Sequence, residues 1–352
     1  MIDDERQLGE FLSCLRTADW IALDTEADSL HAYPEKLCLL QLSGAGVDEL
    51  VDPLAPIDLA PLLELLGKHE LILHGADYDL RLLRRTFGFV PSAIFDTMLA
   101  ARLLGHLQFG LTSLVAQLLA VTLEKGPQKA NWAVRPLTER MENYARNDSR
   151  YLRPLSEALR GQLREKGRLE WHRETCAQLI RDCAEPRTID PDEVWRLKGS
   201  DKLMPRAQAI LRELWRWRER EAVAANKPPY FILSHEAMVA FSREAAELGA
   251  PPEIAPRQVA PRRQAGFLAA LAAGLAVPAA DWPQRRRVFV DPLTAGEKQR
   301  FEDLRRIRDR RAGELGIDPT LIASRATMVA LAKDTAAAQI ELLNWQRDLL
   351  FH

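Results

Sequence analysis

Apolar and polar positions in the first 95 residues alternate between strand-like and helix-like patterns. Short apolar runs at 20–23, 37–42, 50–51 and 71–74 predict buried strands, and leucines at helical spacing in 59–66 and 78–87 predict helices. This alternation indicates an α/β domain with a central, at least partly parallel sheet. From residue 96 the pattern becomes helical, with Asp96 as the expected N-cap of a helix through Leu104, and with further helices at 111–119 and 139–159.

The residues after about 190 predict helices and no strands. An amphipathic helix at 206–223 carries alternating apolar and Arg residues, a Pro pair follows, and Ser234 is the expected cap of the next helix. Residues 296–332 repeat this plan. Prolines mark a linker at 250–263 and a second break near 278–292. We therefore expect an α/β domain over 1–170 and two related helical domains over 190–250 and 265–352.

Composition narrows the class of protein. Of 352 residues, 47% are hydrophobic and 28% charged, which is ordinary for a soluble globular chain. The longest apolar runs are far shorter than the ~18–20 residues of a membrane span, and the acidic N-terminus lacks the plan of a secretion signal. The four cysteines form no CxxC pair, which argues against zinc and a disulfide framework. We expect a cytoplasmic protein without membrane contact.

Charge is distributed unevenly along the chain. Residues 1–150 carry a formal charge of −8 and residues 151–352 carry +6, which together give the net charge of −2. An acidic half followed by a basic half fits a metal-binding domain joined to a polyanion-binding one, although drift of surface charge explains the same difference. The candidate phosphate-binding residues in the helical part are Arg216, Arg218, Arg220, Arg305, Arg306, Arg308, Arg310 and Arg311. Trp215 and Trp217 fit the core of their module better than a base-stacking surface.

Carboxylates stand at positions where the predicted elements would bring them together. Asp24 and Glu26 follow the first strand, and because side chains alternate along a strand, both point the same way. Asp79 begins a helix after the strand that ends at His74, with Asp77 as a rival. Tyr144 and Asp148 share one face of a later helix. Like charges gathered in this way favour a divalent cation with hard oxygen ligands, Mg²⁺ or Mn²⁺.

Several motifs in this order resemble one enzyme family. They are Asp24-Thr25-Glu26-Ala27-Asp28-Ser29-Leu30, Leu39-Leu40-Gln41-Leu42, His74-Gly75-Ala76-Asp77-Tyr78-Asp79-Leu80, Phe95-Asp96-Thr97, Asn131-Trp132-Ala133-Val134-Arg135-Pro136-Leu137 and Tyr144-Ala145-Arg146-Asn147-Asp148. Over residues 18–155 the chain is similar to the DEDDy 3′→5′ exonucleases, and among them to the ribonuclease D family. The helical modules at 195–245 and 290–350 resemble HRDC domains. The family usually has Asp before this tryptophan, where this chain has Asn131.

The resemblance implies a fold, a reaction and a set of site residues. The fold is the ribonuclease H-like (DnaQ-like) exonuclease domain with a mixed sheet, followed by all-α HRDC-type modules. Two Mg²⁺ or Mn²⁺ ions, held by Asp24, Glu26, Asp79 and Asp148, act on the last phosphodiester of a 3′ end, and Tyr144 orients the attacking water. The product is a nucleoside 5′-monophosphate. The residues implied as substrate contacts are Thr25, Gln41, His74, Trp132 and Arg135.

The expected substrate is RNA with a single-stranded 3′ end, especially tRNA precursors, and the expected assembly is a monomer. His74 also fits a core residue at a strand end, and Asp96 fits a helix cap better than a metal ligand. Two other functions stay open at this point. The same carboxylates would serve an exonuclease that prefers DNA, and a relative without catalytic activity could act as a nucleic-acid-binding adaptor.

Overall fold

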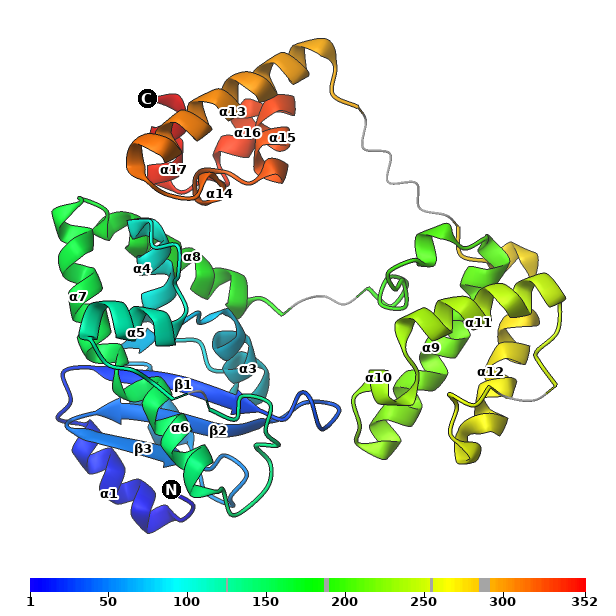
Figure 1. Cartoon of the computed structure of the whole chain (residues 1–352), viewed down its shortest axis with the longest axis horizontal. Helices are drawn as coiled ribbons and strands as arrows, with labels where there is room; N and C mark the ends of the chain where they lie inside the picture. Colours follow the sequence, from blue (N-terminus) through cyan, green and yellow to red (C-terminus); the bar gives the residue numbers. More distant parts are fainter. Residues whose placement is uncertain (125, 187–189, 254–255, 285–291) are drawn as a thin grey trace. The chain divides into compact units, whose positions relative to one another are not determined.

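A computed structural model describes residues 1–352 except 125, 187–189, 254–255 and 285–291 (Figure 1). The chain forms two compact units. The first comprises Met1–Ala27, Leu37–Pro186 and Asp291–His352, and the second comprises Asp28–Lys36 and Arg187–Val290. Among the described helices, none combines the length and the apolar character that crossing a bilayer requires.

A mixed five-stranded sheet organises the first unit, as the sequence predicts. The strands are β1 (Ile21–Ala27), β2 (Leu37–Gly44), β3 (Val47–Val51), β4 (Glu70–Leu73) and β5 (Ala93–Asp96), in the order β3-β2-β1-β4-β5. The β1–β2 and β2–β3 pairs are antiparallel, whereas β1–β4 and β4–β5 are parallel. Asp24 lies opposite Gln41 in this register. The short strand β5 was not predicted.

Eight helices accompany the sheet within the first 186 residues of the described chain. They are α1 (Glu5–Leu15), α2 (Ala60–Leu66), α3 (Asp77–Phe87), α4 (Thr97–Leu104), α5 (Leu111–Leu119), α6 (Glu139–Arg150), α7 (Leu152–Glu165) and α8 (Leu169–Ala184). The single helix predicted over 139–159 is wrong, because the chain breaks at Tyr151 between α6 and α7. Pro154 in the sequence marks the start of this second helix, because a proline, which lacks the backbone N–H, is tolerated in the first turn of a helix and not in its interior.

The two faces of the sheet bury different side chains. Alternate β2 residues such as Leu40 and Leu42 join a cluster with residues of α1, α2 and α3, while Leu39 joins Trp132 and residues of α6. This alternation is the two-residue period of a strand buried on both faces. Cys38 is fully buried in this core.

The last five helices pack within the first unit. They are α13 (Ala295–Leu315), α14 (Pro319–Ile322), α15 (Arg325–Lys333), α16 (Thr335–Gln339) and α17 (Asn344–Phe351). Trp345 stacks on Trp171 of α8 with ring centroids 5.0 Å apart. The buried Arg168 donates to Leu103 O at 2.7 Å and to Leu315 O at 2.8 Å, which joins the end of α4 to the end of α13.

The second unit is a separate helical bundle. Its helices are α9 (Pro205–Ala225), α10 (Pro229–Ile232), α11 (His235–Leu248) and α12 (Gln264–Leu275). Trp217 is buried against Phe267 of α12, as a core residue should be. The sequence assigns α12 to the second helical domain from residue 265, but its side chains complete the core around α9.

The internal repeat predicted from the sequence is visible in the helices. A 21-residue helix, a four-residue helix and a Ser-capped helix follow one another both in α9–α11 and in α13–α15. Ser234 Oγ accepts from Ala237 N, and Ser324 Oγ accepts from Thr327 N. The two modules therefore share one local plan, although one belongs to each unit.

Candidate active site

Three carboxylates from β1 and α6 form the centre of the site. Asp24 and Glu26 project from the same side of β1, and Asp148 faces them from α6. One oxygen of each lies within 4.8 Å of one oxygen of the others. The structure thus brings together side chains that are more than 120 residues apart in sequence.

Asp79 approaches this group from the first turn of α3. Its Oδ1 accepts a hydrogen bond of 2.5 Å from the hydroxyl of Thr25, which lies between Asp24 and Glu26. The charge of Asp79 raises the pKa of both Asp24 and Asp148, so it belongs to the same electrostatic site. Asp77 instead pairs with Arg81 at 2.8 Å and leaves half of its side chain exposed. Asp79 thus lines the cavity with the other carboxylates, and the described cavity lining does not include Asp77.

Burial and mutual repulsion set the protonation of the carboxylates. Burial, followed by the charges of neighbouring carboxylates, raises the pKa of Glu26 to about 9 and holds the pKa of Asp24 well above its usual range. Burial is also the main reason why the pKa values of Asp79 and Asp148 are raised to about 7. Carboxylates that are shielded from water and close to one another, with no cation beside them, cannot all be ionised at neutral pH. A divalent cation would remove this repulsion.

Tyr144 lies beside Asp148 on the same face of α6. Burial first and the charge of Asp148 second raise the pKa of the Tyr144 phenol, so the phenol stays protonated and can donate a hydrogen bond. The Gly126 backbone lies directly against the ring. An added Cβ would meet Tyr144 Cδ2 at 1.5 Å, so only glycine allows this approach. The loop before α6 therefore fixes the ring.

A cavity of about 860 Å³ opens over the carboxylates. That volume is within the usual range for a small-molecule site. Its walls include Asp24, Thr25, Glu26, His74, Tyr78, Asp79, Gly110, Leu111, Thr112, Ser113, Gln128, Tyr144, Asn147 and Asp148. The sequence did not single out Thr112, Ser113 or Gln128, because polar residues in loops and at helix starts carry no periodic signal.

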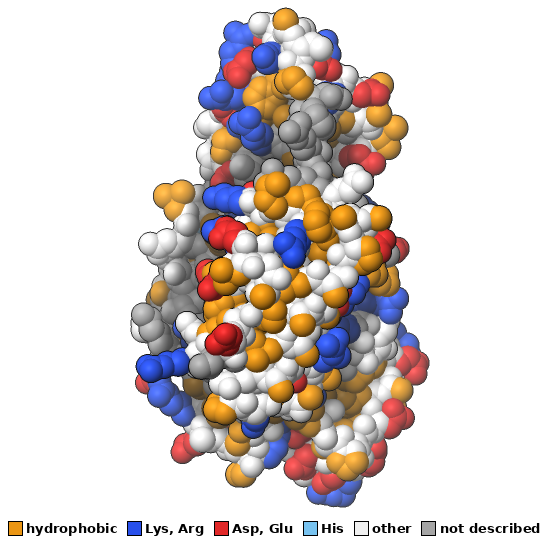
Figure 2. Space-filling model, turned by 90° about the vertical axis from the view of Figure 1, so that its right-hand side faces the viewer, with side chains coloured by type: hydrophobic (Ala, Val, Ile, Leu, Met, Phe, Trp, Pro, Cys, Tyr) orange, Lys and Arg blue, Asp and Glu red, His pale blue; other side chains and the backbone are white. Residues whose placement is uncertain are grey.

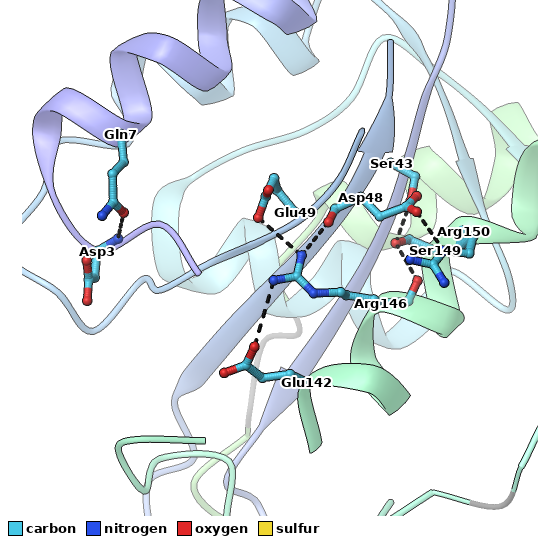
Figure 3. A network of polar contacts seen from close by, with 9 residues as sticks. All are labelled: Asp3, Gln7, Ser43, Asp48, Glu49, Glu142, Arg146, Ser149 and Arg150. Carbon is cyan, nitrogen blue, oxygen red and sulfur yellow. Dashed lines mark hydrogen bonds and ion pairs between the residues drawn. The ribbon is translucent and has the colours of Figure 1, made fainter. Parts of the chain in front are cut away.

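Polar contacts between α6 and the β2–β3 hairpin hold the helix against the sheet (Figure 3). Arg146 donates to Asp48 O and pairs with Glu49 at 3.1 Å. Arg150 pairs with Asp48 at 2.6 Å, and the buried hydroxyls of Ser43 and Ser149 are 2.8 Å apart. Arg146, Ser149 and Arg150 lie on the same helix as Tyr144 and Asp148. Their contacts therefore fix how α6 is rotated about its axis and where Tyr144 and Asp148 lie over the sheet.

The comparisons with known proteins agree with this geometry. Residues 1–164 match the family model of the 3′-5′ exonuclease domain, and residues 207–271 match that of the HRDC domain. Ribonuclease D of Pseudomonas paraeruginosa is 32% identical over 94% of this chain and 89% of its own length. Ribonuclease D of Granulibacter bethesdensis is 31% identical over 99% and 90%. The chain belongs to the ribonuclease D family.

A solved structure extends this result to the fold. The crystal structure of Escherichia coli RNase D, described as an exoribonuclease involved in structured RNA processing, superimposes with a TM-score of 0.75. The two are 25% identical over 100% of this chain and 96% of that one. Membership in the ribonuclease D family makes this chain a 3′→5′ exoribonuclease.

The remaining expected substrate contacts of this ribonuclease D relative occupy different places. Thr25 and His74 line the cavity. Gln41 and Trp132 are 0% and 1% exposed, so neither offers a surface to a substrate in this structure. Gln41 lies opposite Asp24, and the Trp132 ring is 6.1 Å from that of Tyr144. Arg135 binds Asp52 through two hydrogen bonds of 2.5 and 2.7 Å and also donates to Trp132 O, Val134 O and Cys38 O. Its guanidinium is thus occupied within the protein, which argues against the expected substrate contact.

Asp96 does more than cap α4. Its carboxylate accepts from Met98 N and Leu99 N at 2.8 and 3.1 Å, which confirms the predicted cap. It also accepts from Gly75 N at 3.0 Å and Ala76 N at 2.8 Å. One buried side chain therefore joins the start of α4 to the turn that leads into Asp79.

The arginines of the helical modules are largely engaged with acids of the same helix. Arg216 pairs with Glu213 at 2.7 Å, and Arg308 with Asp309 at 2.7 Å. On the face in Figure 2, basic side chains stand as separate spots among apolar and acidic ones. Exposed Arg220 has no ion pair with any described residue. Most of the candidate phosphate-binding arginines are therefore paired with acids, and their contact with RNA stays a prediction.

Proposed function

We propose that this exoribonuclease hydrolyses the last phosphodiester at single-stranded 3′ ends of RNA, with two Mg²⁺ or Mn²⁺ ions, and releases nucleoside 5′-monophosphates. Precursors of tRNA and other structured RNAs with 3′ extensions are the proposed substrates. The observation that carries the proposal is the group of half-buried carboxylates, Asp24, Glu26 and Asp148, which lines a cavity large enough for a nucleotide.

The donor set fits hard divalent cations. Asp24, Glu26, Asp79 and Asp148 offer only oxygen ligands, as Mg²⁺ and Mn²⁺ prefer. Among the described residues, no cation contributes to lowering their raised pKa values. Bound cations would lower the pKa of an attacking water and offset charge on the leaving 3′ oxygen. A single aspartate or histidine could not hold cations at both the attacking water and the leaving oxygen.

The other residues position the reacting groups. Thr25 keeps one oxygen of Asp79 turned toward β1 through its hydrogen bond. Tyr144 acts as a neutral donor that orients the water, because its raised pKa disfavours a phenolate base. The cavity wall between Gly110 and Ser113 faces the same space and would receive the substrate beyond the carboxylates.

Matched oligonucleotides test the proposal. We expect a 5′-labelled RNA to shorten one nucleotide at a time with Mg²⁺ or Mn²⁺ and not with EDTA, and mass spectrometry should identify 5′-monophosphates. Asp24→Asn should lower the rate at least about a thousandfold, since losing several kcal/mol of transition-state stabilisation has that effect. Asp77→Asn is the matched control outside the carboxylate group and should keep the rate.

Two outcomes would contradict the proposal. Shortening that continues in EDTA would exclude the metal mechanism, and faster digestion of the matching DNA would assign the chain to DNA instead. For the structured substrates, a tRNA transcript with a 3′ extension should be trimmed back to the folded body. Size-exclusion chromatography with light scattering should give the mass of one chain.

A further inference from the structure

His74 is held in one orientation by two hydrogen bonds behind it. Its Nδ1 lies 2.9 Å from Thr97 Oγ1, and that hydroxyl lies 3.0 Å from Leu73 O. A carbonyl oxygen can only accept, so the Thr97 hydroxyl donates to Leu73 O and accepts from His74 Nδ1–H. This chain of donors puts the ring proton on Nδ1 and leaves Nε2 as an acceptor.

The backbone after His74 fixes the ring further. Gly75 N and Ala76 N both donate to Asp96, and Gly75 has a φ of +72°. A Cβ at Gly75 would meet Met98 Cε at 2.2 Å, so this turn requires glycine. His74 therefore cannot easily rotate away from its place in the cavity wall.

His74 lines the catalytic cavity. The residue is half-buried and lines the same space as all four carboxylates. Within the described part of the chain, nothing forms a hydrogen bond with Nε2. Burial lowers the pKa of His74, which keeps the ring neutral and the acceptor free at neutral pH.

A neutral, acceptor-only group selects for a donor on the substrate. The phosphate oxygens of a nucleic acid only accept, and base donors differ from one base to the next. The 2′-hydroxyl is the donor that every ribonucleotide carries and that deoxyribonucleotides lack. We propose that His74 Nε2 accepts a hydrogen bond from the 2′-hydroxyl of a nucleotide flanking the scissile phosphate, so that His74 is a determinant of RNA preference. This inference rests on the proposed exoribonuclease function.

Single 2′-deoxy substitutions test this role. Single-turnover rates with Mg²⁺ are measured on an all-RNA oligomer and on two copies with one deoxynucleotide, either at the 3′ end or next to it. In the wild-type chain we expect one of these substitutions to slow the first cleavage about three- to tenfold, the effect of one net hydrogen bond. His74→Ala should slow cleavage of all-RNA by the same factor and remove the penalty for deoxynucleotides.

His74→Phe provides a second variant that fills the space without an acceptor, and it should behave as His74→Ala does. His69→Ala, which changes a histidine outside the cavity, should keep the full deoxy penalty. Equal slowing of every substrate by both His74 variants, or a deoxy penalty that both retain, would overturn the assignment. A wild-type chain that shortens no RNA would instead refute the proposed function.

Discussion

Replacing Asp148 by Asn should make the metal-free protein more stable at pH 8 while abolishing its activity. The folded chain holds a proton on Asp148 up to about pH 7, whereas the ordinary pKa of this carboxyl is 3.8. Folded protein therefore binds more protons than unfolded protein between these values, and its free energy of unfolding falls as pH rises through them. A shift of about 3 units corresponds to about 4 kcal/mol. Asparagine does not ionise, so it removes this loss of stability at pH 8. It also removes a charge that raises the pKa of Glu26.

Thermal unfolding in EDTA measures the effect. For a unit of this size, about 4 kcal/mol corresponds to a rise of roughly 8–16 °C in Tm at pH 8. At pH 4, where Asp148 is protonated in the wild type, the two proteins should melt together. Adding Mn²⁺ at pH 8 should raise the Tm of the wild type more than that of the variant. Asp77→Asn should leave Tm unchanged.

The reasoning is refuted if Asp148→Asn melts at or below the wild type at pH 8 in EDTA. It is also refuted if the gain is the same at pH 4 and pH 8, because a gain without pH dependence cannot come from a carboxylate that titrates between them.

Three further predictions follow from contacts at and beyond the site. Tyr144→Phe should lower kcat about 10- to 100-fold in steady-state assays yet keep the Mn²⁺-induced rise in Tm, since the phenol orients water and leaves the carboxylates in place; loss of both would contradict this. Arg168→Ala should cost about 2–4 kcal/mol in urea unfolding by removing two charged hydrogen bonds, and an unchanged midpoint would contradict their role. Gly105→Ala should make the last helices more sensitive to limited proteolysis. Gly105 has a φ of +89°, and a Cβ there would meet Gly316 O at 2.1 Å. Gly9→Ala is the control and should behave as wild type, because a Cβ at Gly9 meets no atom within 4 Å.

Local patterns predicted the parts of the site that depend on local geometry. The strand period placed Asp24 and Glu26 on one side, and the helix period placed Tyr144 and Asp148 on one face. That these pairs meet could not come from local patterns, since α6 and β1 are far apart in sequence. The family motifs indicated that the two pairs belong to one site. The distance between their carboxylate oxygens follows from the sheet register and from the contacts of α6 with the sheet.

Long-range packing was the main feature that the sequence did not reveal. Arg168 looked like one more basic residue, yet it is buried and joins two helix ends. Arg135 looked like a substrate contact because it lies in a family motif, yet it pairs with Asp52, which is 83 positions away. A cation in a motif has the same sequence signal whether its partner is a substrate or another part of the fold.

The contacts between α6 and the β2–β3 hairpin explain how the fold keeps a group of carboxylates together. Repulsion among Asp24, Glu26 and Asp148 pushes α6 away from β1, and four buried carboxylates without a cation cannot all ionise. Arg146 and Arg150 oppose this movement by holding α6 on the hairpin from the opposite side. Because the helix cannot retreat, the repulsion is relieved by protonation or by bound cations. The same rigidity that destabilises the metal-free protein at high pH should therefore strengthen its affinity for divalent metal.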